Sequence, residues 1–429
     1  SEEAAPELSV SPSKSVSPSQ SPNPEATSSL VPAREVNFAP VDPGMLGMHV
    51  AGAQEGDWPS DAVPVESFRL WDTGTSWLQI EANRGRYDWR LLDRALETSS
   101  AGVDDALMVL GPTPVWNAST TRGVQYPVPG AASVPRSFKA WDEFVSAVVD
   151  RYAGQITAYQ IWNEASLKMF WRGSPAQMAE LTQRAYRIIK EKDPEALVVA
   201  ASTTIRLSGA YNRFFPAYLE ALAERDWPVD VLAIHSYPSG EDDPLQRSRN
   251  LRQVRQTLAE LDAPSLPVWD TELNYGLAGP GDIPRTEVVG DQATSWVVRT
   301  YLDSLRFGIA RTYWYIWTPE PYDLLGLQMT NDSAGAAGLR TVSAWVGGGE
   351  WGGCTVSGLV NSCLVRKDGV VSEVLWSDFL GGTVAGFAAG AEVCDFRNEC
   401  SALDGSSVAV TSDPVRVTPA REFVEVDNS

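Results

Sequence analysis

The stretch from Ser137 to Glu164, SFKAWDEFVSAVVDRYAGQITAYQIWNE, contains one complete helix-and-strand unit. Its first part, Ser137–Ala153, opens on a serine and carries apolar residues at helical spacing, which predicts an amphipathic helix. Its last part, Ala158–Glu164, is a nearly continuous apolar run that stops on an amide and a carboxylate. Such a run is typical of a strand that is covered on both faces in a parallel sheet.

The same unit recurs in both directions along the chain. Eight apolar runs alternate with amphipathic stretches such as Ser174–Pro194, which starts with Ser-Pro and stops at a proline. The runs are Met45–Val50, Ser67–Trp71, Ala106–Gly111, Ala158–Glu164, Leu197–Thr203, Val229–Tyr237, Leu266–Glu272 and Arg311–Trp317. Eight strand–helix units predict an α/β fold, the (β/α)8 TIM barrel. A doubly wound open sheet is the alternative, but the loop after its first strand, AGAQEGDW, is a poor match to a phosphate-binding glycine loop.

Three segments with different patterns divide the chain. Residues 1–34 are rich in serine and proline and poor in large apolar residues, so we expect a disordered linker there. Residues 35–346 are assigned to the barrel. Residues 347–429 show alternating residues and glycine turns without a helical run, which predicts a small β-sandwich accessory domain. The segment 31–40 could add a strand to this accessory domain.

The composition excludes several classes of partner. The net charge of −21 would repel phosphate backbones, so nucleic acid is not expected, and a polyanionic glycan is disfavoured. No apolar run approaches the ~20 residues that a membrane-spanning helix needs. The sequence does not begin with Met. A removed signal peptide, with a lipid or cell-wall tether upstream of residue 1, would fit the Ser/Pro-rich spacer, and an artificial start is the alternative.

The four cysteines all lie in the last segment, at Cys354, Cys363, Cys394 and Cys400. None of them forms a C-x-x-C pattern, so a zinc site is not expected, and neither is another cofactor. Their even number in a β-rich segment predicts two disulfides, although free buried thiols are the alternative. Of the three possible pairings we expect the sequence-local one, Cys354–Cys363 with Cys394–Cys400. Disulfides would place the protein outside the cytosol, secreted or in the cell envelope.

Polar side chains end several of the eight predicted strands. In a barrel of this kind the active site lies at the carboxyl ends of the strands. Glu164 ends the fourth run and Glu272 the seventh, which lie across the barrel from each other. Two carboxylates so placed can hydrolyse a glycosidic bond, with a separation of ~5–5.5 Å in retaining enzymes and ~6.5–9.5 Å in inverting ones. Further candidates for binding the substrate are His49, Arg69, Asp72, Trp116, Asn163, His235, Tyr237 and Trp317. For Asp72, a helix cap is the alternative.

The motifs at these strand ends resemble a known group of enzymes. IWNE on the fourth strand, HSY on the sixth and TEL on the seventh look like clan A retaining glycosidases. Three longer segments look most like family 39 of that clan: Phe68–Asp93, Leu110–Ser119 and Trp141–Gly173. The resemblance implies that Glu164 is the general acid/base and Glu272 the nucleophile.

The resemblance also implies roles for the neighbouring residues. Asn163 would bind the 2-hydroxyl of the cleaved sugar, and Arg69 and Tyr237 would hydrogen-bond Glu272. His235 would orient this network, and Trp317 would form the floor under the sugar. The chain departs from the family where Glu164 is followed by Ala-Ser instead of proline. This departure leaves the geometry of that loop open.

The sequence therefore predicts a retaining glycoside hydrolase that cleaves O-glycosidic bonds of an oligo- or polysaccharide through a glycosyl-enzyme intermediate. A transglycosidase with the same residues and a non-catalytic glycan-binding barrel are the alternatives. The presence of both glutamates disfavours the silent barrel. An iduronide substrate is disfavoured, because few basic residues are expected in the site.

Overall fold

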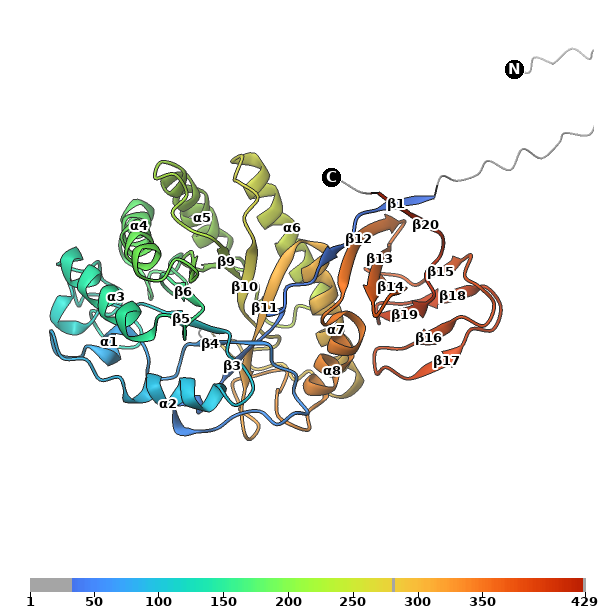
Figure 1. The fold of residues 1–429 in the computed structure, drawn as a ribbon, viewed down its shortest axis with the longest axis horizontal. Helices are drawn as coiled ribbons and strands as arrows, with labels where there is room; N and C mark the ends of the chain where they lie inside the picture. The colour runs from blue at the N-terminus through green and yellow to red at the C-terminus, as the bar shows by residue number, and fades with distance from the viewer. Residues whose placement is uncertain (1–32, 280–281, 427–429) are drawn as a thin grey trace, which may run out of the picture.

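The computed structural model describes residues 33–279 and 282–426 (Figure 1). The linker predicted for residues 1–34 lies outside the described residues as far as residue 32. Figure 1 shows a barrel of strands with helices on its outside, and a second group of strands beside α7 and α8. Among the described residues, no helix has the length and apolar character needed to cross a membrane.

The central sheet is parallel and closes on itself. Its strands follow the order β7-β6-β5-β4-β3-β11-β10-β9-β8. The bounds are β3 Leu46–Val50, β4 Ser67–Leu70, β5 Ala106–Val109, β6 Ala158–Gln160, β7 Leu197–Val199, β8 Thr203–Thr204, β9 Leu232–His235, β10 Val268–Leu273 and β11 Ile309–Trp317. The two ends of this order, β7 and β8, are parts of one stretch, and Val199 of β7 also bridges to Val231 beside β9. The sheet is therefore an eight-stranded barrel, which confirms the predicted fold class.

Helices cover the outside of the barrel and follow its strands in turn. Their bounds are α1 Trp77–Ile80, α2 Arg90–Ser99, α3 Phe138–Tyr152, α4 Pro175–Lys192, α5 Ser208–Ala223, α6 Pro244–Glu260, α7 Gly290–Arg306 and α8 Ala334–Val346. Two short 3-10 helices span Ala53–Glu55 (η1) and Val115–Asn117 (η2). Ser137 accepts a hydrogen bond from the backbone N–H of Ala140 and so caps α3, while Ser174 caps α4 through Gln177.

Two hydrophobic cores hold the barrel. The larger core lies between the strands and the helices. The smaller core fills the barrel interior with one or two side chains from each of several strands: Leu107, Ala158, Val199, Val231, Ala233, Trp269 and Tyr313. Because the interior is packed, a ligand can enter only at the ends of the strands.

The C-terminal strands form a seven-stranded sheet in the order β17-β16-β19-β14-β13-β12-β2. The bounds are β2 Ala39–Pro40, β12 Glu350–Ser357, β13 Val360–Lys367, β14 Val370–Ser377, β16 Glu392–Cys394, β17 Cys400–Ala402 and β19 Val415–Thr418. Two further pairs lie beside it, β1 Arg34–Val36 with β20 Phe423–Glu425, and β15 Gly382–Ala385 with β18 Ser407–Val410. The segment before the barrel thus supplies β1 and β2 to these strands.

Both disulfides join residues that lie directly opposite each other on neighbouring antiparallel strands. Cys354 and Cys363 pair across β12 and β13, and Cys394 and Cys400 across β16 and β17. The predicted pairing is therefore confirmed.

Candidate active site

A cavity of about 450 Å³ opens at the carboxyl ends of the barrel strands. Its walls are rich in aromatic and apolar side chains, with a few convergent polar groups, as is usual for a ligand site. The aromatic side chains are Trp71, Tyr126, Phe170, Tyr237 and Tyr315, and the polar ones are Asp72, Asn163, Glu164, Lys168, Arg206 and Glu272.

Glu164 and Glu272 meet in this cavity. A carboxylate oxygen of each and the Nδ1 atom of His235 lie within 4.8 Å of one another. Glu272 lies on β10, whereas β6 ends at Gln160 and Glu164 lies in the loop that follows. The side chains of Glu164 and Glu272 are 12% and 8% exposed. The two carboxyl groups are thus close to each other and mostly buried, and both line the same cavity.

The loop that carries Glu164 is tied to the neighbouring strand. Glu164 has a φ of +43°, which is unusual for a residue other than glycine. Its backbone N–H donates to Ser202 Oγ at 2.9 Å, and that of Ala165 donates to the Ser202 carbonyl at 3.0 Å. Ser166 Oγ accepts from the backbone N–H of Thr204 at 3.1 Å. These hydrogen bonds hold the loop after Glu164, in which the chain has Ala-Ser instead of the proline of the related family. Ser166 itself makes one of them.

Glu272 is held by two donors. Arg69 Nη1 lies 2.7 Å from Glu272 Oε1, and the Tyr237 hydroxyl donates to Oε2 at 3.0 Å. Burial raises the pKa of Glu272, while His235 and Arg69 oppose this rise. Burial and the nearby Glu272 charge raise the pKa of Tyr237 well above its ordinary value, so the phenol remains a hydrogen-bond donor.

Arg69 is fully buried and joins three strands or their ends. Besides Glu272 on β10, it donates from Nε to Gln160 Oε1 and from Nη2 to Asn163 Oδ1, each at 2.8 Å. Because Asn163 Oδ1 faces this guanidinium, its Nδ2 group is left to donate toward the cavity. A permanently charged, bidentate group thus orients both the carboxylate and the amide.

His235 is neutral, and its neighbours determine which ring nitrogen carries the proton. Burial lowers the pKa of His235 to about 4. Gln160 presents Oε1 to Arg69 and therefore donates from Nε2 to Thr271 Oγ1 at 3.2 Å. The Thr271 hydroxyl then donates to His235 Nε2 at 2.9 Å, which leaves the proton on Nδ1. This Nδ1–H donates to Glu164 Oε1 at 2.9 Å.

Glu164 lies in an environment that favours its neutral form. Burial raises the pKa of Glu164, and Arg206 and Arg69 act in the opposite direction. Glu272 has a direct ion pair with Arg69, whereas the hydrogen bond to Glu164 comes from a neutral imidazole. Of the two carboxyl groups, Glu272 is therefore the one that the site stabilises as an anion.

Asp72 lines the cavity at the end of β4 and accepts a hydrogen bond from the Tyr315 hydroxyl at 2.7 Å. Its φ is +61°, so the chain turns sharply at this residue. Asp72 does not cap α1, since Ser76 occupies that position.

Two predicted substrate contacts do not reach the cavity. His49 is fully buried beneath it and donates from Nε2 to the Thr271 carbonyl at 2.9 Å, while burial lowers its pKa well below the ordinary value. Trp116 lies in η2, where the loop after β5 packs against α1, and its indole donates to the Glu81 carbonyl at 2.7 Å. The structure therefore places neither His49 nor Trp116 in the lining of this cavity, and the sequence pattern alone does not distinguish them from residues that face it.

Trp317 was also misplaced by the sequence pattern, because β11 contains one extra residue. Trp314 pairs with Met48 and Trp317 with Val50, so three steps on β11 match two on β3. Trp317 therefore faces the helix-side core like Trp314, and its indole donates to Asn331. Tyr315 is the residue of this strand that lines the cavity.

Several site residues were not predicted. Gln160 and Thr271 lie inside strands, where polar side chains had no strand-end signal. Arg206 and Lys168 lie in loops that line the cavity, so the expectation of a site poor in basic groups was wrong. Glu164, His235 and Glu272 are also spaced to hold a cation. The positive charge beside them comes instead from Arg69 and Arg206.

The buried neutral His235 is expected to make stability depend on pH. Its pKa of about 4 lies below the ordinary value of 6.5, so below pH 6.5 the unfolded chain binds a proton that the folded chain does not. Stability should therefore fall as the pH drops from 6.5 toward 4, by on the order of 3 kcal/mol from this residue. His235→Gln should remove this part of the pH dependence. Urea unfolding at neutral and acidic pH measures the unfolding free energy of both proteins. An equal loss of unfolding free energy on acidification in the wild type and in His235→Gln would contradict this prediction.

The comparisons with known proteins can now be set beside this geometry. The model of glycosyl hydrolase family 10 matches residues 73–303, while no curated protein sequence matches. A family 39 glycoside hydrolase from Bacteroides cellulosilyticus WH2 has a TM-score of 0.63 at 16% identity, over 88% of this chain and 81% of that one. A family 39 β-xylosidase from Caulobacter crescentus has a TM-score of 0.60 at 17% identity, over 90% and 100%. A family 30 xylanase C from Talaromyces cellulolyticus has a TM-score of 0.60 at 13% identity, over 90% and 99%.

These findings agree with the clan A resemblance of the strand-end motifs. The structural neighbours share the barrel fold and include the family 39 enzymes that the sequence resembles. The family model covers more than half of the 429 residues, from the loop after β4 into α7. The chain therefore belongs to glycosyl hydrolase family 10 and is a clan A glycosidase.

Proposed function

We propose that this glycosidase is a retaining hydrolase of O-glycosidic bonds in an oligo- or polysaccharide. The separation of the two carboxylates carries the proposal. One oxygen of Glu164 and one of Glu272 lie within 4.8 Å of each other, which fits the ~5–5.5 Å of retaining sites better than the ~6.5–9.5 Å of inverting ones.

In the first step, Glu272 attacks the anomeric carbon and the bond to the leaving oxygen breaks. Glu164 gives its proton to that oxygen, and a glycosyl ester forms on Glu272. Arg69 and Tyr237 hold Glu272 ionised and aimed, and His235 fixes Glu164 Oε1 so that Oε2 can face the leaving group. Asn163 donates to the sugar 2-hydroxyl, a contact that strengthens in the transition state.

In the second step, the Glu164 carboxylate removes a proton from water, whose oxygen attacks the anomeric carbon. The ester bond breaks and Glu272 leaves as a carboxylate. The ester carries no negative charge, so the repulsion between the two carboxylates is absent while Glu164 acts as base. A transglycosidase would use the same steps with a sugar hydroxyl in place of water.

The stereochemistry of the first product tests this mechanism. Aryl β-xylosides and β-glucosides are the first substrates to try, because similar structures include a β-xylosidase, a xylanase and glucanases. Proton NMR of a cleaved glycoside should show the anomer of the substrate before mutarotation sets in. An initial product of the opposite anomer would rule out double displacement. Products longer than the substrate would reveal transfer to sugar.

We also propose that the enzyme acts outside the cytosol. Both disulfides lie in the C-terminal sheet, and such bonds persist in oxidising compartments.

A further inference from the structure

Two cations in the catalytic cavity have no part in the proposed mechanism. Arg206 follows β8, and Lys168 lies four residues after Glu164. Both line the cavity. Within the described residues neither forms an ion pair, and Arg206 Nε is buried without a hydrogen-bond partner. A buried donor without a partner is costly, so a ligand that supplies an acceptor would be favoured.

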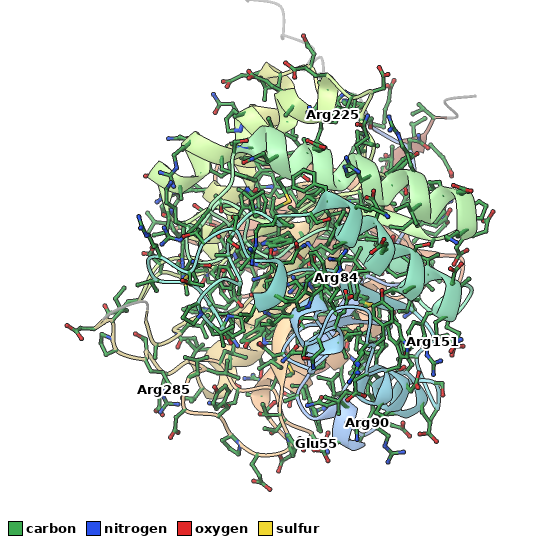
Figure 2. The ribbon with its side chains drawn as sticks, turned by 90° about the vertical axis from the view of Figure 1, so that its left-hand side faces the viewer. Glu55, Arg84, Arg90, Arg151, Arg225 and Arg285 are labelled. Carbon is green, nitrogen blue, oxygen red and sulfur yellow. A yellow bond between two sulfur atoms is a disulfide. The ribbon has the colours of Figure 1, made fainter. Side chains whose placement is uncertain are left out.

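The chain has 55 acidic and 34 basic residues, so carboxylates outnumber cations. Of the arginines labelled in Figure 2, four form ion pairs, with Asp88 at Arg90, Asp93 at Arg151, Glu224 at Arg225 and Glu287 at Arg285. The exposed Arg84 forms none within the described residues. The fully buried Arg247 is paired with Asp270. An exposed cation such as Arg84 is solvated by water, whereas Arg206 is half-buried and its Nε has no acceptor within the described residues.

The position of Arg206 relates it to the reacting groups. Its guanidinium lies 5.6 Å from the centre of the Tyr237 ring, and Tyr237 donates to Glu272. After burial, Arg206 is the largest influence on the pKa of Glu164, and it lowers that pKa. A lower pKa leaves Glu164 less protonated, which opposes its role as the proton donor. An anion bound at Arg206 would offset the cation and allow Glu164 to keep its proton until the substrate is in place.

We propose that the cavity accepts a glycan whose sugar at or next to the cleaved bond carries a carboxylate, held by Arg206 and assisted by Lys168. This inference rests on the proposed function. The planar guanidinium matches a carboxylate, with two parallel N–H donors for its two oxygens. The net charge of −21 does not prevent such binding, because salt screens distant charges over ~8 Å while these two cations contact the ligand.

The test compares one polysaccharide in two forms. A glucuronic-acid-bearing xylan and the same xylan after carbodiimide-borohydride reduction differ only in their carboxyl groups. The wild type should cleave the acidic form with a kcat/KM about 10- to 100-fold higher, the range expected for a charge-assisted hydrogen bond. Arg206→Gln should bring this ratio close to one, and Lys168→Gln should lower it partially. Arg213→Gln, an exposed arginine on α5, is the matched control and should keep the wild-type ratio.

The outcomes separate this inference from the proposed function. If neutral glycosides are cleaved but the acidic and reduced xylans are cleaved equally, the carboxylate site is wrong and the hydrolase remains. If Arg206→Gln lowers both rates in the same proportion, Arg206 does not recognise the carboxylate. If neither xylan nor any aryl glycoside is cleaved, both the function and the inference fail. Preference for a sulfated glycan over the acidic xylan would also overturn the carboxylate assignment.

Discussion

Glu272→Gln should abolish turnover, with a loss in kcat on the order of 10⁴- to 10⁶-fold, as found when a covalent nucleophile is removed from other hydrolases. The amide keeps the shape of the side chain, and its one oxygen can still accept from Arg69, while its NH2 group would lie beside the Tyr237 hydroxyl and can donate to it. It cannot form the glycosyl ester, because a neutral amide is a poor nucleophile. Steady-state kinetics on an aryl glycoside measure the loss.

Two controls separate lost chemistry from lost structure. Arg69 is fully buried and loses its charged partner in Glu272→Gln. The stability of this variant must therefore be compared with that of the wild type by thermal melting. Glu272→Ala with added azide gives a second reading, because azide can then attack the anomeric carbon directly. The glycosyl azide should have the anomeric configuration opposite to that of the substrate. Near-normal turnover by Glu272→Gln would remove Glu272 from the mechanism.

Glu164→Ala should lower kcat/KM by about 10²- to 10⁴-fold for substrates whose leaving group needs a proton. The loss should be much smaller for aryl glycosides with acidic phenols, since these leave without protonation. For such substrates the second step becomes slow, so the glycosyl ester should accumulate. A series of aryl glycosides with leaving groups of graded pKa measures this dependence.

Azide should restore activity to Glu164→Ala by attacking the accumulated ester. In this variant the glycosyl azide should have the same anomeric configuration as the substrate, opposite to the product of Glu272→Ala. Glu287→Ala, which removes an exposed carboxylate from the 282–289 loop, is a control that should behave as wild type in both assays. Losses that are equal for good and poor leaving groups would show that Glu164 is not the proton donor.

The sequence was informative where a polar residue ends a buried strand. Burial makes such a residue costly unless it has a partner or a function, and this argument predicted Glu272 and His235, which the structure brings together with Arg69 beside the cavity. It also placed Glu164, although the strand stops at Gln160 and the glutamate lies in a loop. Their catalytic roles stay predictions.

Other positions depended on features that a sequence pattern does not record. Because β11 contains an extra residue, Tyr315 and not Trp317 lines the cavity, and no local sequence motif indicates this extra residue. Gln160 and Thr271 act through partners on other strands, so their importance appears only when those strands are adjacent. Arg206 lies in a loop after a strand, and the basic character of the cavity could not be counted before that loop was placed.

Arg69 has a consequence for how activity relates to folding. Arg69 lies on the second strand of the barrel, and its one guanidinium contacts residues of the fourth strand, of the loop after it and of the seventh strand, which are far apart in the chain. These groups come together only when the sheet has closed, so a fragment or a partly assembled barrel lacks an aligned pair of carboxylates. Catalytic activity therefore requires the closed barrel, because no local segment of the chain supplies all of these groups. Activity can thus report on whether the barrel has folded completely.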